Sequence, residues 1–162
     1  MALATQTQFK RDILENETNE KVTSILQQNL TNFIDLALLL KQAHWNVIGP
    51  NFRSVHLQLD VIIASVRDAS DEIAERISAL GVSPDGRSST VAQSSELSEY
   101  PHDFIKVSGT ITQVADAMKL AIDHLRSGIE KVGDLDPITE DMLIGISGPI
   151  EKHLWMVQAQ EE

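Results

Sequence analysis

Apolar residues recur at intervals of three and four along most of the chain, which is the period of an amphipathic helix. The first such run extends from about Thr18 to about Trp45 and includes Val22, Leu26 and Leu30. A Gly-Pro pair follows, and it ends the helix because proline lacks the N–H that a helix needs. This pattern predicts a first long helix.

The second run begins after Asn51, a residue type that suits a helix N-cap, and continues to Gly81, which suits the position just past a C-terminus. Residues 82–102 are rich in Ser, Pro and Gly and indicate a connection, with room for a short helix near Thr90 to Leu97. The predicted core-facing stripe of the second helix is Phe52, Val55, Leu59, Ile62, Val66, Ala69 and Ile73.

Two more helical runs complete the chain. The third spans about Asp103 to Val132, and the fourth opens at Asp136 and Pro137, a favourable N-cap and first-turn pair. We expect a kink or a local break in the fourth helix. The residues that interrupt its period are Gly145, Gly148 and Pro149.

The composition agrees with packed helices. Hydrophobic residues make up 42% of the 162 positions and aromatic residues only 4%, with Leu, Ile, Val and Ala dominant. We predict an all-α, four-helix bundle whose second and third helices are joined by a long crossover that contains a short helix. The expected organisation is a polar tail over residues 1–16 and one domain over residues 17–162.

Charge narrows the classes of partner. The chain has 13 basic and 24 acidic residues, a formal net charge of -11, so its body should repel nucleic acid and anionic membranes and attract cations. The absence of cysteine excludes disulfides and thiolate metal sites. No apolar stretch approaches a membrane span or a signal-peptide core, which makes the cytoplasm the expected location and a membrane partner unexpected.

Candidate metal ligands lie along the second helix. His56 and Asp60 are four residues apart, as are Asp71 and Glu75, so each pair shares one helix face. Imidazole and carboxylate together suit iron. Asp60 and Asp71 lie on the same stripe but about 16 Å apart along a straight axis, so one helix cannot close both pairs around one metal.

A second copy of the helix would solve this problem. If two copies pack antiparallel across a two-fold axis near Ser65 and Val66, the pair around His56 faces the partner's pair around Glu75, and each dimer has two equivalent sites. His44 lies one loop upstream of this helix and could fold back as a further nitrogen ligand. The spacing therefore predicts a metal site shared between subunits.

These residues carry a family resemblance. The segments Lys41-Gln-Ala-His-Trp-Asn and Gly49-Pro-Asn-Phe, followed by His56 with its acidic partners and a Leu154-Trp155 pair, resemble the Dps family, the miniferritins. The resemblance covers nearly the whole chain. It implies a hollow shell of twelve subunits that oxidises Fe(II), preferably with hydrogen peroxide, and stores Fe(III) mineral. The implied iron ligands are His44, His56 and Asp60 of one subunit and Asp71 and Glu75 of its two-fold mate.

The implied chemistry is physically reasonable. Two ferrous ions that give one electron each reduce peroxide fully to water, so hydroxyl radical need not form. Trp45 is adjacent to His44 and is either a scavenger of escaping oxidant or simply an aromatic packed at a helix end. A single His–Asp pair on a helix is usually an ordinary surface pair. Both pairs on one stripe, in this sequence context, favour a ferroxidase.

Other candidates are weaker. Glu99 and His102 imitate a Glu-x-x-His motif of larger di-iron proteins, but Pro101 and a loop setting argue against a site. His124 and His153 are expected to be solvated or hydrogen-bonded. Acidic residues open the fourth helix, where they stabilise its N-terminus in any case. The resemblance implies iron-entry pores at this point, and the assigned residues are Asp136, Glu140 and Asp141.

Direct DNA binding is expected to be weak or absent near neutral pH. The first sixteen residues offer only Lys10 and Arg11 as cations, against Asp12 and Glu15, and phosphate neutralisation needs clustered cations. Twelve tails in a shell could still bind at low salt through avidity. Two rival functions are a structural nucleoid protein that shields DNA physically and a helical adaptor for a partner protein.

Overall fold

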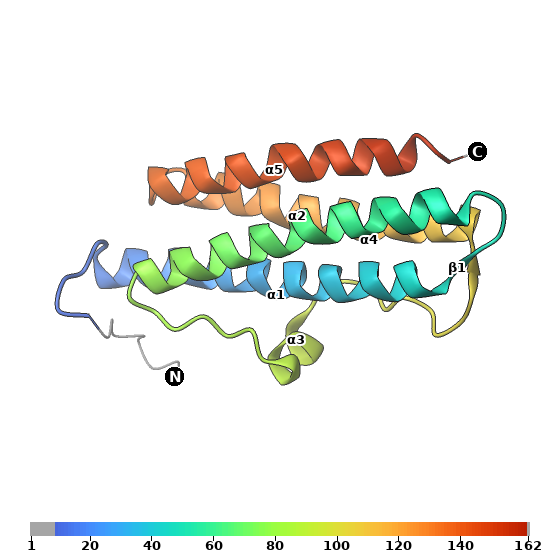
Figure 1. Ribbon diagram of the computed structural model, residues 1–162. Coiled ribbons are helices and arrows are strands. Elements are labelled where there is room, and N and C mark those ends of the chain that lie inside the picture. Colours follow the sequence, from blue (N-terminus) through green and yellow to red (C-terminus); the bar gives the residue numbers. More distant parts are fainter. Residues whose placement is uncertain (1–8, 162) are drawn as a thin grey trace.

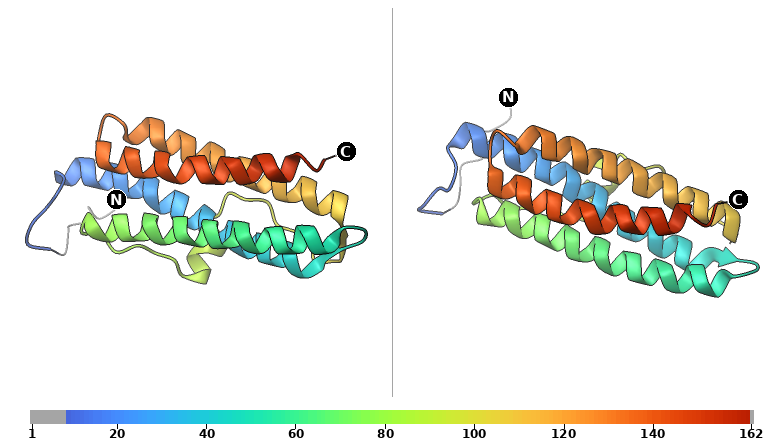
Figure 2. Two further views of the ribbon diagram at one scale, coloured as in Figure 1. Left: turned by 45° about the horizontal axis from the view of Figure 1, so that its top comes forward. Right: turned by 90° about the horizontal axis from the view of Figure 1, so that it is seen from above.

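Four long helices form an antiparallel bundle, and the computed structural model describes residues 9–161 (Figure 1). This architecture confirms the predicted all-α bundle with a short helix in the crossover. In Figure 2 the four long helices run side by side, while the short helix lies outside the bundle. The helices are α1 (Asn16–Asn46), α2 (Phe52–Ala79), α3 (Ser88–Ser94), α4 (Val107–Val132) and α5 (Pro137–Gln158).

A two-stranded parallel pairing at one end of the bundle was not predicted. Strand β1 (Val47–Ile48) pairs with β2 (Ile105–Lys106), with Val47 opposite Ile105. Each strand is two residues long, too short for any alternation to show in a sequence. Because β2 occupies the residues just before α4, that helix begins at Val107 and not at Asp103 as expected.

Two other boundaries differ from expectation. The short helix lies over Ser88–Ser94 and overlaps the predicted segment, Thr90 to Leu97, but begins and ends a few residues earlier. Helix α5 runs unbroken through Pro149, so the expected local break does not occur. Proline crowds the residue four positions earlier in a helix. That residue is Gly145, and Pro149 has no N–H to donate to its carbonyl, so the helix continues with one hydrogen bond fewer.

The core lies between the four long helices and is made of aliphatic side chains from all of them. Burial of this apolar surface provides most of the stability, at about 25 cal/mol per Å². Within residues 9–161, none of the helices combines the length and the apolar character needed to cross a membrane. The largest fully buried side chains include Phe33, Leu26, Leu40, Leu59, Ile62, Ile73, Met118, Leu125 and Leu143.

The crossover between α2 and α4 is attached to α1 by polar side chains. Gln27 donates to the carbonyl of Asp85 (2.9 Å) and accepts from its N–H (2.8 Å), so one side chain satisfies both backbone groups. Asn32 accepts from the N–H of Glu96 at 3.1 Å. Hydrogen bonds of this kind satisfy a loop backbone that would otherwise lie unpaired against the bundle.

The predicted tail covers residues 1–16, of which 1–8 lie outside the described residues. In the described part, Leu14 packs against the core, and α1 begins at Asn16. Lys10 and Arg11 are both exposed.

Candidate metal centre

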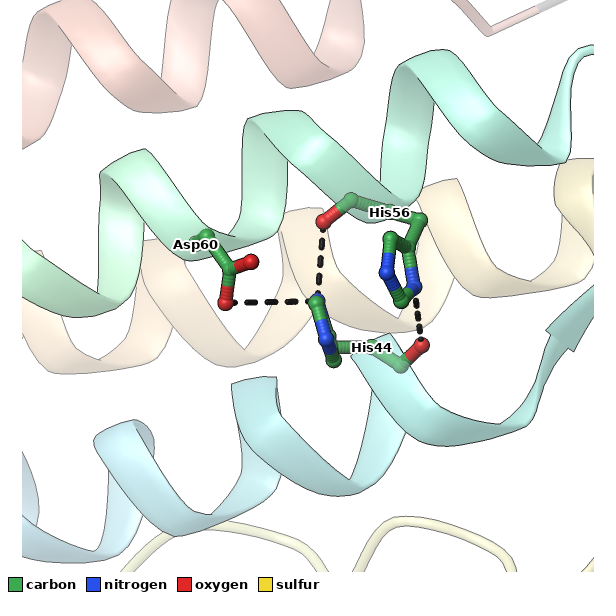
Figure 3. Close-up of side chains that lie close together, drawn as sticks. All are labelled: His44, His56 and Asp60. Carbon is green, nitrogen blue, oxygen red and sulfur yellow. Dashed lines mark hydrogen bonds and ion pairs between the residues drawn. The ribbon is translucent and has the colours of Figure 1, made fainter.

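Three of the predicted ligands converge where α1 ends and α2 begins. His44 lies in the last turn of α1, and His56 and Asp60 lie on successive turns of α2. One possible ligand atom from each residue lies within 4.8 Å of those of the other two (Figure 3). His44 is buried, His56 is half-buried and Asp60 is exposed, so the cluster opens to the surface.

The two histidines hold each other in place. His44 Nδ1 lies 2.8 Å from the carbonyl oxygen of His56, and His56 Nδ1 lies 2.8 Å from that of His44. The rings stack with centroids 3.6 Å apart. A carbonyl oxygen only accepts, so each Nδ1 carries the proton. In the neutral imidazole, Nε2 then has the free lone pair through which histidine binds a metal.

The carboxylate of Asp60 is already paired with the ammonium group of Lys41, which would compete with a metal ion for it. Lys41 Nζ donates to Asp60 Oδ1 at 2.7 Å, and His44 Nδ1 lies 3.4 Å from the same oxygen. The hydrogen bond from Lys41 holds the pKa of Asp60 below its ordinary value, with a smaller contribution from His44. The carboxylate is thus ionised and ready to bind a cation, but an incoming metal has to displace the ammonium group.

Asp71 and Glu75 do not join this cluster within one subunit. They lie further along α2 and are exposed. They belong to a stripe that runs the length of the helix at alternating spacings of four and three, apolar at one end and acidic at the other. Its members are all exposed, and they are Leu57, Val61, Ala64, Asp68, Asp71 and Glu75.

A shallow groove of about 260 Å³ accompanies the acidic end of this stripe. It lies between α1, α2 and the start of the crossover, and its lining is largely apolar apart from Arg67, Ser70 and Asp71. Leu57 and Val61, at the other end of the stripe, are 48% and 60% exposed. An antiparallel second copy would bring such apolar side chains to this groove.

Sequence reasoning missed the roles of Lys41 and of the reciprocal histidine bonds. Lys41 lies three residues before His44, so both share one face of α1, and this spacing was the available signal. The carbonyl contacts of the histidines depend on the α1–α2 packing and have no sequence signal. Trp45 follows His44 but its side chain is 65% exposed, so it is not packed within the subunit at the helix end.

The acidic residues assigned to pores separate into two groups. Asp136 is buried, and its carboxylate accepts from Arg76 Nη2 at 2.6 Å and from Thr139 Oγ1 at 2.5 Å. It therefore ties α5 to α2 within the subunit, which disfavours a pore role. Glu140 is half-buried and Asp141 is exposed, so the pore role of these two stays a prediction.

Asp136→Asn is expected to destabilise the protein by about 3 kcal/mol at neutral pH, because it leaves Arg76 largely buried without a charged partner. Burial alone would raise the pKa of Asp136, but the bonds from Thr139 and Arg76 outweigh it and lower that pKa. The stabilisation is therefore present above the unfolded-state pKa and is lost as pH falls through the lower, folded-state pKa. Urea unfolding from pH 7 to pH 3 should show the two proteins converging in acid, and a constant difference would contradict this account.

The remaining histidines have ordinary partners. His124 Nδ1 lies 3.0 Å from Glu96 Oε2, so it does have one carboxylate partner, and His153 Nε2 lies 2.9 Å from Ser65 Oγ. Burial lowers the pKa of His153. Glu99 and His102 are exposed in the irregular part of the crossover. None of these places three metal-binding side chains together within the described residues.

Comparison with known proteins identifies relatives over almost the full chain. A family model described as a ferritin-like domain matches residues 23–162. The chain is 36% identical over 156 residues to the "DNA protection during starvation protein" of Mycolicibacterium smegmatis, covering 96% of this chain and 85% of the relative. Among solved structures, the tetragonal form of Mycobacterium smegmatis Dps superposes with a TM-score of 0.89 at 36% identity, covering 95% and 93% of the two chains. Dps from Microbacterium arborescens in a high iron form has a TM-score of 0.86 at 30% identity, covering 92% and 97%.

Proposed function

The chain belongs to the Dps family of the ferritin-like superfamily, and on this premise we propose that it oxidises Fe(II) with hydrogen peroxide at a site shared by two subunits, and stores the Fe(III) product in a twelve-subunit shell. Removal of iron and peroxide would protect DNA from oxidative damage. The observation that carries the proposal is the cluster of His44, His56 and Asp60, in which the Nδ1 atom of each imidazole contacts a backbone carbonyl and leaves Nε2 for a metal.

The donor set fits iron as a substrate. Two imidazole nitrogens and one carboxylate oxygen are too few to enclose a metal ion, and they leave room for further ligands and for peroxide. Asp71 and Glu75 of the mate would add two hard oxygen donors that favour Fe(III). Two Fe(II) ions, one peroxide molecule and two protons give two Fe(III) ions and two water molecules, so electrons balance without hydroxyl radical.

The stripe on α2 supports the two-fold arrangement. An antiparallel axis that pairs Asp60 with Asp71 also pairs His56 with Glu75, because each pair of residue numbers sums to 131. The same antiparallel pairing sets Leu57 opposite Ala74 and Val61 opposite Ser70. Ala74 and Ser70 both line the groove beside Asp71. The axis thus passes near Ala64 and Arg67, which are exposed, whereas Val66 is buried in its own core.

The test is anaerobic addition of Fe(II) to the assembled protein, followed by stoichiometric peroxide, with Fe(III) absorbance and hydroxyl-radical trapping as readouts. Fast oxidation with little radical is expected. It should be lost in a His44→Ala, Asp71→Ala variant and kept in a matched control, His102→Ala, Asp103→Ala, which changes exposed residues of the crossover. Oxidation by the wild-type protein no faster than in buffer would refute the proposal.

Lys41→Met is expected to tighten metal binding, because it removes the ammonium that competes for Asp60. The pair is partly exposed, so the gain should be only about twofold to fivefold. The affinity is measured by titration with Co²⁺, which oxygen does not readily oxidise as it does Fe(II). Lys119→Met is the matched control, since Lys119 makes a similar exposed pair with Asp123 on α4. Unchanged or weaker binding in the Lys41 variant would argue against competition.

Glu140 and Asp141 are proposed to attract iron at the start of α5, where they add negative charge at the helix N-terminus. Glu140 is half-buried and Asp141 is exposed, whereas Asp136 is buried. A Glu140→Gln, Asp141→Asn variant should take up iron more slowly while it oxidises iron at the same intrinsic rate. Equal uptake would remove the two residues from the entry route.

Direct DNA binding is proposed to contribute little. Lys10 and Arg11 are exposed but stand beside Asp12 and Glu15, and the net charge of the chain is -11. Electrostatic attraction to phosphate therefore lacks a dense cationic patch in the described part of the chain. Stable complexes in a gel shift at neutral pH and physiological salt would favour the alternative, a nucleoid protein that shields DNA physically.

A further inference from the structure

The five-residue loop between α1 and α2 reverses the chain with two residues in left-handed backbone conformations. Gly49 has φ +106° and Asn51 has φ +65°. Left-handed conformations are strained for residues with a Cβ atom, least so for Asn and most for β-branched residues. Two such positions within three residues bring the end of α1 directly against the start of α2.

This loop is anchored on both sides. The N–H of Val47 bonds to the carbonyl of Ala43, and β1 pairs with β2 at the start of α4. On the other side, the N–H of Phe52 bonds to the carbonyl of Gly49 at 3.1 Å. These bonds attach the loop to both helices and to the start of α4, so its backbone conformation affects how α1 and α2 meet.

The stacked histidines lie on either side of this reversal. His44 is five residues before Gly49 and His56 is seven residues after it. Their rings are 3.6 Å apart, and each Nδ1 bonds to the other's carbonyl at 2.8 Å. Bonds this short fail if the two helix ends shift by an ångström, and the tautomer that frees Nε2 is then no longer fixed.

We propose that Gly49 is a positioning residue for the metal site: its left-handed backbone conformation sets His44 against His56 and so keeps both Nε2 atoms ready to bind metal. The inference rests on the proposed function, since it concerns the same site. It is separable from packing, because a Cβ atom built on Gly49 meets nothing within 4 Å. An alanine methyl group placed there perturbs the backbone and touches no neighbour.

The test compares Gly49→Asn, Gly49→Ala and Gly49→Val by Co²⁺ titration of assembled protein, followed by the visible absorption of bound Co²⁺. Backbone strain predicts small, intermediate and large losses in that order. For Ala the strain reduces the population of the binding-competent loop, and a loss of about tenfold in affinity is expected. Steric crowding would instead follow side-chain size and make Asn worse than Ala.

Two controls separate the possible failures. Gly145→Ala also adds a methyl group in open space, but at a helical position in α5, and should bind Co²⁺ as the wild type does. His56→Ala removes a ligand. If His56→Ala loses Co²⁺ while all three Gly49 variants bind normally, the positioning role is refuted and the metal site stands. If His56→Ala binds normally, the site itself is refuted, and the positioning role with it.

Discussion

Shells assembled from equal amounts of His44→Ala and Asp71→Ala subunits are expected to recover about a quarter of the wild-type rate of peroxide-driven iron oxidation, although shells of either variant alone should have none. The two residues lie on different helices of one subunit, and Asp71 is absent from the cluster around His44. A shared site makes them partners only across a two-fold axis.

The fraction follows from counting sites. Random mixing makes half of the dimers mixed, and each mixed dimer has one site with both mutations and one with neither. Intact sites are therefore about one in four. If each subunit built its own site, every subunit of the mixture would carry a defect and no activity would return.

The experiment needs subunits that exchange before assembly, which co-expression with two different affinity tags provides. Shells that carry both tags are purified and assayed. The control mixes His44→Ala with His56→Ala, whose residues belong to the same half of the site. Every site in that mixture lacks a histidine, so activity should stay at the level of either variant alone. Recovery in the control as well would contradict the shared site.

The sequence predicted the helices well because their apolar period is long and regular, whereas local features decided by packing escaped it. Strands β1 and β2 are each two residues long, and they pair residues 47 and 105, which are far apart in the sequence. No sequence pattern could therefore indicate them. A kink or a local break was expected around Pro149, and no break occurs there, since α5 runs unbroken through it. Tertiary packing overrides local propensity at such positions, and a sequence does not show that packing.

For the candidate site too, residue spacing predicted some features, and others depend on the packing of the helices. The spacing on one helix made Asp60 and Asp71 candidate ligands and predicted that one subunit could not bring them together. In the structure Asp71 indeed lies outside the cluster that contains Asp60. Spacing could not show that Lys41 occupies the carboxylate of Asp60, since that contact joins two helices. It also could not distinguish Asp136 from its acidic neighbours, because only the fold shows that Arg76 holds it.

Val61→Asp is expected to dissociate the two-fold pair and to abolish metal binding at the shared site. Val61 is 60% exposed in the subunit and, under the antiparallel pairing, faces Ser70 beside Asp71 of the mate. A carboxylate there would lie close to the mate's Asp71. Like charges brought together at an interface cost several kcal/mol, and the change occurs twice per dimer, so dimerisation should weaken by roughly a hundredfold or more.

Light scattering across a dilution series measures the loss of dimers, and Co²⁺ titration measures the loss of the site in the same samples. Ile144→Asp is the matched control, because Ile144 is 51% exposed on α5, away from the stripe. Whatever that variant does to larger assemblies, its dimers should persist and bind Co²⁺. A Val61→Asp protein that stays dimeric with normal Co²⁺ affinity would show that α2 does not pair through this stripe. The proposed ligands Asp71 and Glu75 would then need another route to His44.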